Sequence, residues 1–138
     1  MKRLLVILGL ALAVGGCRDP VLEAKADALP RAGFPCTYCH AKGGRASPEF
    51  DLAGTIYADQ NATEGLAGVT VRLFETSGRQ QTATTNEVGT FLLEPGALEL
   101  DFPLWVRIEF GDEVRSMQTP IFRERSCAAC HRSPTGPD

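Results

Sequence analysis

Apolar and polar side chains alternate along several short stretches between residues 50 and 119. Val69, Val71 and Leu73 share one face of such a stretch, and apolar positions in residues 104–110 recur at the same interval. A period of two residues is typical of a strand with one buried face. The pattern predicts a mainly β fold, a seven-stranded antiparallel β-sandwich. The expected strands are residues 52–56, 69–73, 80–85, 90–93, 98–100, 104–110 and 114–119.

The same alternation predicts where two large side chains near the end of this region point. Trp105 shares a face with Arg107 and Glu109, so we expect it on the outer surface. Met117 shares a face with Arg115, which indicates that it points away from the core. In an antiparallel sandwich with this number of strands, the first strand begins and the last strand ends at opposite ends. This arrangement favours a separation of the two segments that flank the sandwich, although the flanking loops are long enough to bring them together.

The N-terminus has the layout of an export signal. Two basic residues precede an apolar run of eleven residues, from Leu4 to Val14, which is short for a membrane span. The run leads through small residues to Cys17, and residues 14–17 resemble the lipobox of bacterial lipoproteins. That resemblance implies cleavage before Cys17 and acylation of its sulfur and amino group, which together give a stable membrane anchor. A plain signal peptide with an incidental cysteine is the alternative.

Removal of the leader also bears on partners and location. The formal net charge of -3 falls by two, to -5, when Lys2 and Arg3 are lost. No concentrated basic face remains, so we do not expect nucleic acid as a partner. Position two of the mature chain is Arg18 and not Asp, and we see no signal for retention at the inner membrane. We expect an exported, lipid-anchored protein of the cell envelope, at the outer membrane in preference to the inner, periplasmic or surface-exposed.

Two pentapeptides hold four of the five cysteines and both histidines of the 138-residue chain. C-x-x-C-H is the attachment pattern of c-type haem. Each thiol adds across one haem vinyl group to form a thioether, and the histidine that follows becomes an axial iron ligand. The sequence therefore predicts two covalently attached haems. The predicted haem-binding residues are Cys36, Cys39 and His40 in the first motif (CTYCH), and Cys127, Cys130 and His131 in the second (CAACH).

The second axial position of each iron is less well specified. The chain has no further histidine, and Met117 is the one methionine that remains after Met1 is lost with the leader. Met117 is a candidate sixth ligand, in the first place for the haem on the second motif, and an ordinary gap-filling methionine is the alternative. For the other haem we leave open Lys25, Lys42, Tyr57, water or a group from another subunit. Arginines near the second motif are candidates to pair with haem propionates or to form a solvated basic face: Arg115, Arg123, Arg125 and Arg132.

Other chemistry fits the cysteine spacing less well. Two C-x-x-C pairs can hold a structural zinc ion, but zinc does not require a histidine directly after both pairs. Disulfides in an exported binding module and a thiol oxidoreductase are further alternatives. We do not expect an enzyme, because nothing in the sequence supplies the distal acid-base residues of a haem peroxidase.

Part of the sandwich region resembles a known family. Residues 54–57, 65–71 and 84–91 (GTIY, GLAGVTV and TTNEVGTF) are similar to the carboxypeptidase regulatory-like, or transthyretin-like, β-sandwich. The resemblance covers about half of the chain, and it departs after Pro95 and Gly96, where the usual aromatic strand opening is absent. It implies a scaffold without catalytic residues. The whole arrangement resembles bacterial dihaem c-type cytochrome lipoproteins that have such a middle domain.

These observations divide the chain into five parts with one expected function. We predict electron transfer by a membrane-anchored, exported dihaem c-type cytochrome that exchanges electrons with redox proteins of the cell envelope. Self-association through exposed haem edges is left open. The predicted parts are the lipoprotein signal peptide (1–16), a lipidated tether (17–35), an N-terminal haem-binding segment (36–49), the β-sandwich (50–119) and a C-terminal haem-binding segment (120–138).

Overall fold

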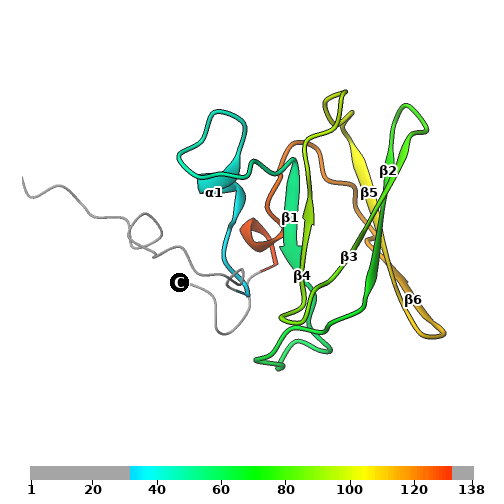
Figure 1. The fold of residues 1–138 in the computed structure, drawn as a ribbon. Helices are drawn as coiled ribbons and strands as arrows, with labels where there is room; N and C mark the ends of the chain where they lie inside the picture. The colour runs from blue at the N-terminus through cyan, green and yellow to red at the C-terminus, as the bar shows by residue number, and fades with distance from the viewer. Residues whose placement is uncertain (1–31, 132–138) are drawn as a thin grey trace, which may run out of the picture.

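The computed structural model describes residues 32–131 (Figure 1). The expected signal peptide, the lipidation site Cys17 and nearly all of the tether lie outside these residues, as do Lys25 and Arg132. Within them no helix is long and apolar enough to cross a membrane. The elements are α1 (Thr37–His40), β1 (Leu52–Thr55), β2 (Thr70–Glu75), β3 (Gln80–Thr84), β4 (Thr90–Leu93), β5 (Leu104–Phe110), β6 (Glu113–Ser116) and the 3-10 turn η2 (Cys127–Ala129).

The described chain is mainly β, with its strands in two antiparallel sheets. One sheet has the order β3-β2-β5-β6, and the other is formed by β1 and β4 alone. Figure 1 shows the two sheets as separate layers, with α1 beyond β1 on the side away from the larger sheet. The core lies between the layers and consists of apolar side chains from both sheets and one loop: Leu52, Val71, Leu73, Phe91, Leu93, Leu100, Leu104 and Val106.

The period-two pattern places these side chains as expected. In β2, Val71 and Leu73 are fully buried while Arg72 between them is half-exposed. Leu73 pairs with Val106 across the β2–β5 ladder, so both strands present their apolar faces to the same layer. Trp105, on the opposite face of β5, is 42% exposed, which confirms its predicted outward direction.

The predicted strand at residues 98–100 does not form, so the described residues contain six strands and not seven. Leu100 is buried, but the backbone here does not join a ladder. The amide of Asp101 instead donates to the carboxylate of Glu75 at 2.9 Å. Pro95 and Pro103 flank the segment, and proline has no N–H to give to a neighbouring strand. The buried carboxylate of Glu75 therefore accepts the hydrogen bond that a neighbouring strand would accept in a ladder.

The chain after β6 returns across the molecule to β1. Residue 121 forms an isolated bridge with Leu104, and Ser126 forms a parallel bridge with Ala53. The amide of Ala53 donates to the carbonyl of Arg125 at 3.1 Å. Figure 1 shows the orange-red turn of η2 on the same side of β1 as α1. The expectation that the two flanking segments lie at opposite ends of the sandwich is therefore wrong, because this return path brings the second segment back to the first strand.

Candidate haem-attachment site

The two C-x-x-C-H motifs adopt the same tight backbone turn. In the first, the amides of Cys39 and His40 donate to the carbonyl of Cys36 at 3.2 and 3.0 Å. In the second, the amides of Cys130 and His131 donate to the carbonyl of Cys127 at 3.2 and 2.8 Å. One helical turn thus brings the two cysteines and the histidine of each motif onto a single short loop. This is the compact arrangement that attachment to two vinyl groups of one ring requires.

The ring of His40 is oriented by two contacts. Its Nδ1 lies 2.6 Å from the carbonyl oxygen of Pro48. Because a carbonyl only accepts hydrogen bonds, Nδ1 carries a proton, and in the neutral ring the lone pair is then on Nε2. The other contact is with Phe50, whose ring stacks on that of His40 with centroids 4.7 Å apart. A metal-binding histidine commonly donates its second ring N–H to a carbonyl in this way, so His40 is prepared to ligate through Nε2.

The loop after the first motif folds back onto α1. The amide of Ala46 donates to the carbonyl of Cys39 at 3.0 Å, and the amide of Gly44 donates to Ala41 at 2.7 Å. A Cβ at position 44 would lie 2.4 Å from the carbonyl oxygen of Cys39, so only glycine permits this approach. The loop ends with the amide of Phe50 donating to the carbonyl of His40 at 2.7 Å. These bonds tie the first motif to the entrance of β1.

The second motif packs directly on β1 through Cys127. A Cβ at Gly54 would lie 2.7 Å from the sulfur of Cys127 and 2.8 Å from the ring of Phe91. Because Gly54 has no side chain, Cys127 can pack directly against the backbone of β1 at this position. Cys127 also packs against the hydrophobic core, whereas Cys130 and His131 are exposed. In the second motif, therefore, the sulfur of Cys127 is packed within the protein, whereas Cys130 and His131 are exposed to solvent.

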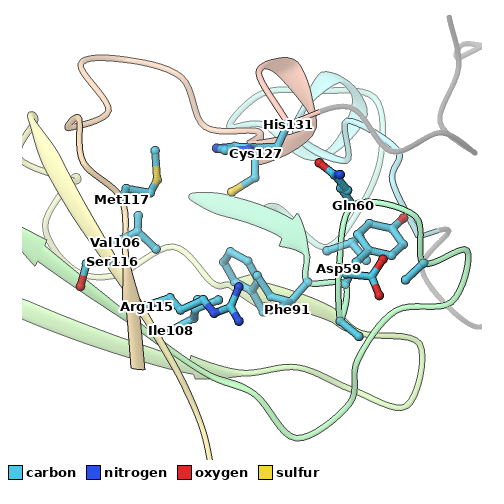
Figure 2. A pocket seen from close by; sticks show the side chains of 15 residues that line it. Asp59, Gln60, Phe91, Val106, Ile108, Arg115, Ser116, Met117, Cys127 and His131 are labelled. Atoms are coloured by element: carbon cyan, nitrogen blue, oxygen red, sulfur yellow. The ribbon is translucent and has the colours of Figure 1, made fainter. Parts of the chain in front are cut away.

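A cavity of about 530 Å³ opens beside Cys127 between the two sheets. Its volume lies within the range of about 300–1,000 Å³ that is usual for ligand pockets. The walls come from β1, β4, β5, β6, residues 57–62 and the second motif, and Phe91 and Val106 extend into it from the core. Figure 2 shows Cys127 and His131 together at one wall, between Met117 on one side and Asp59 on the other. An apolar cavity beside an attachment cysteine and a potential iron ligand fits a haem on the second motif.

Met117 lies on the wall of this cavity, as does Arg115. The prediction that the two residues share a face therefore agrees with the structure. The prediction that Met117 points away from the core is wrong, because the side chain is half-buried and packs against the core cluster. Its amide donates to the carbonyl of Val106 at 3.0 Å, which continues the β5–β6 pairing beyond β6 and turns Met117 inward. The structure brings Met117 to the same cavity as His131.

The other residues considered as iron ligands or propionate partners lie in different places. Arg125 is not directed to the cavity; its guanidinium lies 3.1 Å from the carboxylate of Asp51. Lys42 forms an exposed ion pair with Glu99 at 3.1 Å, and Tyr57 lines the cavity of the second motif. Arg123 is exposed and does not line the cavity, which leaves Arg115 as the arginine on its wall.

The four motif cysteines are unpaired thiols in this structure. Burial raises the pKa of the Cys36 thiol, and it raises that of Cys127 to about 12, with smaller contributions from Cys130, Cys36 and Glu124. A redox-active C-x-x-C pair has a thiol of lowered pKa, so these raised values do not favour a thiol oxidoreductase. Within residues 32–131 no three His, Cys, Asp or Glu side chains gather at metal-binding distance, so the geometry gives the zinc alternative no support.

Sequence reasoning missed three residues that shape the site. Pro48 acts through its backbone carbonyl, which has no signature in a sequence. Phe50 was assigned only to the start of the sandwich. Gly54 stood inside a predicted strand, where an isolated glycine is a known signal of close approach by another group, so this signal was present.

Comparisons with family models, with curated proteins and with solved structures give no match for this chain. The resemblance to the carboxypeptidase regulatory-like fold therefore stays a prediction.

Proposed function

We propose that this protein is an exported, lipid-anchored cytochrome that carries two covalently attached c-type haems and transfers electrons between redox proteins of the cell envelope. Cys36 and Cys39 would attach one haem, and Cys127 and Cys130 the other. His40 and His131 would be the axial ligands. When bound, each haem iron supplies one-electron exchange between its ferric and ferrous states.

The observation that carries the proposal is the orientation of His40. The stacked ring of Phe50 and the hydrogen bond from Nδ1 to the carbonyl of Pro48 orient the imidazole, and in the neutral ring this bond selects the tautomer with the lone pair on Nε2. A histidine used only for packing has no need of this tautomer, whereas an iron ligand does. The second motif has the same pattern of backbone hydrogen bonds as the first, which supports the same role for His131.

The cavity supports a separate environment for the second haem. Its walls are largely apolar, which would exclude water from one face of a bound ring. Met117 lies on the wall and offers a thioether, and Arg115 offers a guanidinium for a propionate. Among the described residues Met117 is the only methionine, and it lies beside the second motif, so we expect the two haems to differ in axial ligation.

The proposal is tested on the full chain, expressed in a host that has haem-attachment machinery. We expect a red protein that stains for covalent haem after denaturation, with the mass of the polypeptide plus two haems. Replacing both cysteines of either motif by serine should remove one haem each. The matched control is Cys17→Ser, which should keep both haems and lose the membrane fraction. A polypeptide without added haem mass, or with bound zinc, would overturn the proposal.

A further inference from the structure

Both C-x-x-C-H motifs contact one short segment, residues 50–54, which leads into β1 and includes most of it. The first meets the chain at Phe50, through the hydrogen bond to the carbonyl of His40 and the stacked ring. The second meets it at Ala53, which bridges Ser126, and at Gly54, on which Cys127 sits. All of these points lie within residues 50–54, in which a bend at Asp51 is followed by β1.

The spacing of these points is short. From Phe50 to Gly54 there are four residue steps, and even a fully extended chain advances only about 3.3 Å per residue, so the points lie at most about 13 Å apart. Pairing with β4 holds this segment in place, because the amide of Asp51 donates to the carbonyl of Leu93 at 2.7 Å and the β1–β4 ladder continues from there. Leu52 pairs with Leu93 and Thr55 with Thr90 in that ladder.

An additional clamp holds the second motif at this distance. The guanidinium of Arg125, two residues before Cys127, donates to the carboxylate of Asp51 at 3.1 Å and to its carbonyl at 3.3 Å. Arg125 also lies over the ring of Phe102, 5.6 Å from its centroid. Asp51 itself is only 14% exposed, so the ion pair is partly shielded from solvent. Asp51 lies between the contact points of the two motifs, and Arg125 lies just before the second motif. The Arg125–Asp51 clamp therefore links these two parts of the chain.

We propose that β1 and the Arg125–Asp51 clamp make the two motifs one paired site, which holds the two haems of a single molecule close enough for electronic contact. This inference rests on the proposed function. It goes beyond it because two motifs at opposite ends of the sandwich would carry haems equally well as independent groups.

The test uses circular dichroism of the two-haem protein in the Soret region. Two strong chromophores held close together couple their transitions and give a bisignate band. We expect that band to exceed the sum of the spectra of two single-haem variants, Cys36→Ser/Cys39→Ser and Cys127→Ser/Cys130→Ser. A two-haem spectrum equal to the sum would overturn the inference while leaving the proposed function intact, because the haem count is measured first.

The clamp is tested by Arg125→Met. We expect a smaller bisignate band with two haems still attached. Arg107→Met is the matched control, since Arg107 also forms an ion pair, with Glu109, and also lies over a ring, that of Phe74, but on the outer face of the larger sheet. The control should leave the band unchanged, and equal bands in both variants would contradict the role of the clamp.

A second measurement covers the case in which a single-haem variant does not fold. In the unaltered protein, the electron paramagnetic resonance signal of one ferric haem should change when the other is reduced. A signal that only loses intensity in proportion to the haem reduced would overturn the inference.

Discussion

At the scale of single residues, small features set the geometry of the second motif. Gly54 provides the space for Cys127, and Met117 lies on the cavity wall next to the same motif. Neither residue forms a polar contact that a motif search would detect. Gly54 matters because it has no side chain beside Cys127, and Met117 matters because it brings a thioether to the wall of the same cavity.

Replacing Gly54 by alanine should disturb the second motif selectively. The new Cβ would lie 2.7 Å from the sulfur of Cys127, and overpacking of this kind costs about 1–3 kcal/mol. We expect reduced haem loading at the second motif and normal loading at the first, measured by mass spectrometry of single-haem species. Gly96→Ala is the control, because its Cβ would come no closer than 3.5 Å to any neighbour. Equal loading in the two variants would contradict this reading of Gly54.

Met117→Leu tests the sixth ligand. Leucine keeps the apolar volume that packs on the core, so the fold should be retained, while the sulfur is lost. We expect the low-spin His/Met spectrum of one haem to disappear and its reduction potential to fall, because methionine ligation raises the potential. Ser116→Ala, on the same cavity wall, should leave both unchanged. An unaltered spectrum in Met117→Leu would show that this methionine only fills space.

At the scale of elements, Glu75 of β2 joins three parts of the chain: the turn after β2, strand β3 and the loop before β5. Its side chain is buried at the end of β2 and accepts hydrogen bonds from Arg79, from Gln81 of β3 and from the amide of Asp101. The loop that replaces the expected fifth strand is therefore held by a carboxylate. This contact explains why a segment with a strand-like pattern packs Leu100 inward without joining a ladder.

Glu75→Gln should destabilise the fold. Hydrogen bonds to a charged group contribute about 1.5–3 kcal/mol, and glutamine keeps the shape without the charge. We expect a loss of that order in the free energy of unfolding, measured by urea denaturation. Glu99→Gln is the control, because Glu99 belongs to an exposed ion pair with Lys42, for which less than about 1 kcal/mol is expected.

The same carboxylate predicts a dependence of stability on acid. The hydrogen bonds from Arg79 chiefly lower the pKa of Glu75 from 4.5 to about 2. Since the pKa is lower in the folded state, the stabilisation is complete above pH 4.5 and is lost as the pH falls toward 2. Urea midpoints measured between these values should decline with acidification, and the decline should be shallower in Glu75→Gln. Parallel curves for the two proteins would contradict the assignment.

At the scale of the whole molecule, the core and the attachment motifs are largely distinct. The buried cluster comes from the strands and Leu100, and of the motif residues only Cys127 packs against it. The sandwich is thus a scaffold that does not depend on the motifs for its core, while the motifs depend on β1 for their positions.

A variant with all four motif cysteines changed to alanine should therefore fold. We expect a β-rich far-ultraviolet circular dichroism spectrum and a cooperative unfolding transition, at a lower urea midpoint than the two-haem protein because the apolar contact of the haems is absent. A noncooperative transition in the variant would show that the scaffold requires the attached groups.

Sequence patterns were sufficient to place most of the strands and to single out the residues on which the proposed haem chemistry rests. Spacing within the C-x-x-C-H motifs is local, so a single stretch of sequence is sufficient to predict the attachment residues. The period-two alternation of residues such as Val71 and Leu73 is also local, because it reflects one buried face of a strand. Both the mainly β class and the outward direction of Trp105 followed from it.

Tertiary structure alone decided how these parts meet. The return of residues 120–126 to β1, which brings the two motifs to one strand, depends on bridges such as Ser126 to Ala53. The tautomer of His40 depends on the carbonyl of Pro48, and the inward direction of Met117 depends on its bond to Val106. Each of these involves the backbone carbonyl of a residue that is not adjacent in sequence, and every residue has the same carbonyl, so no pattern of side chains could have predicted them.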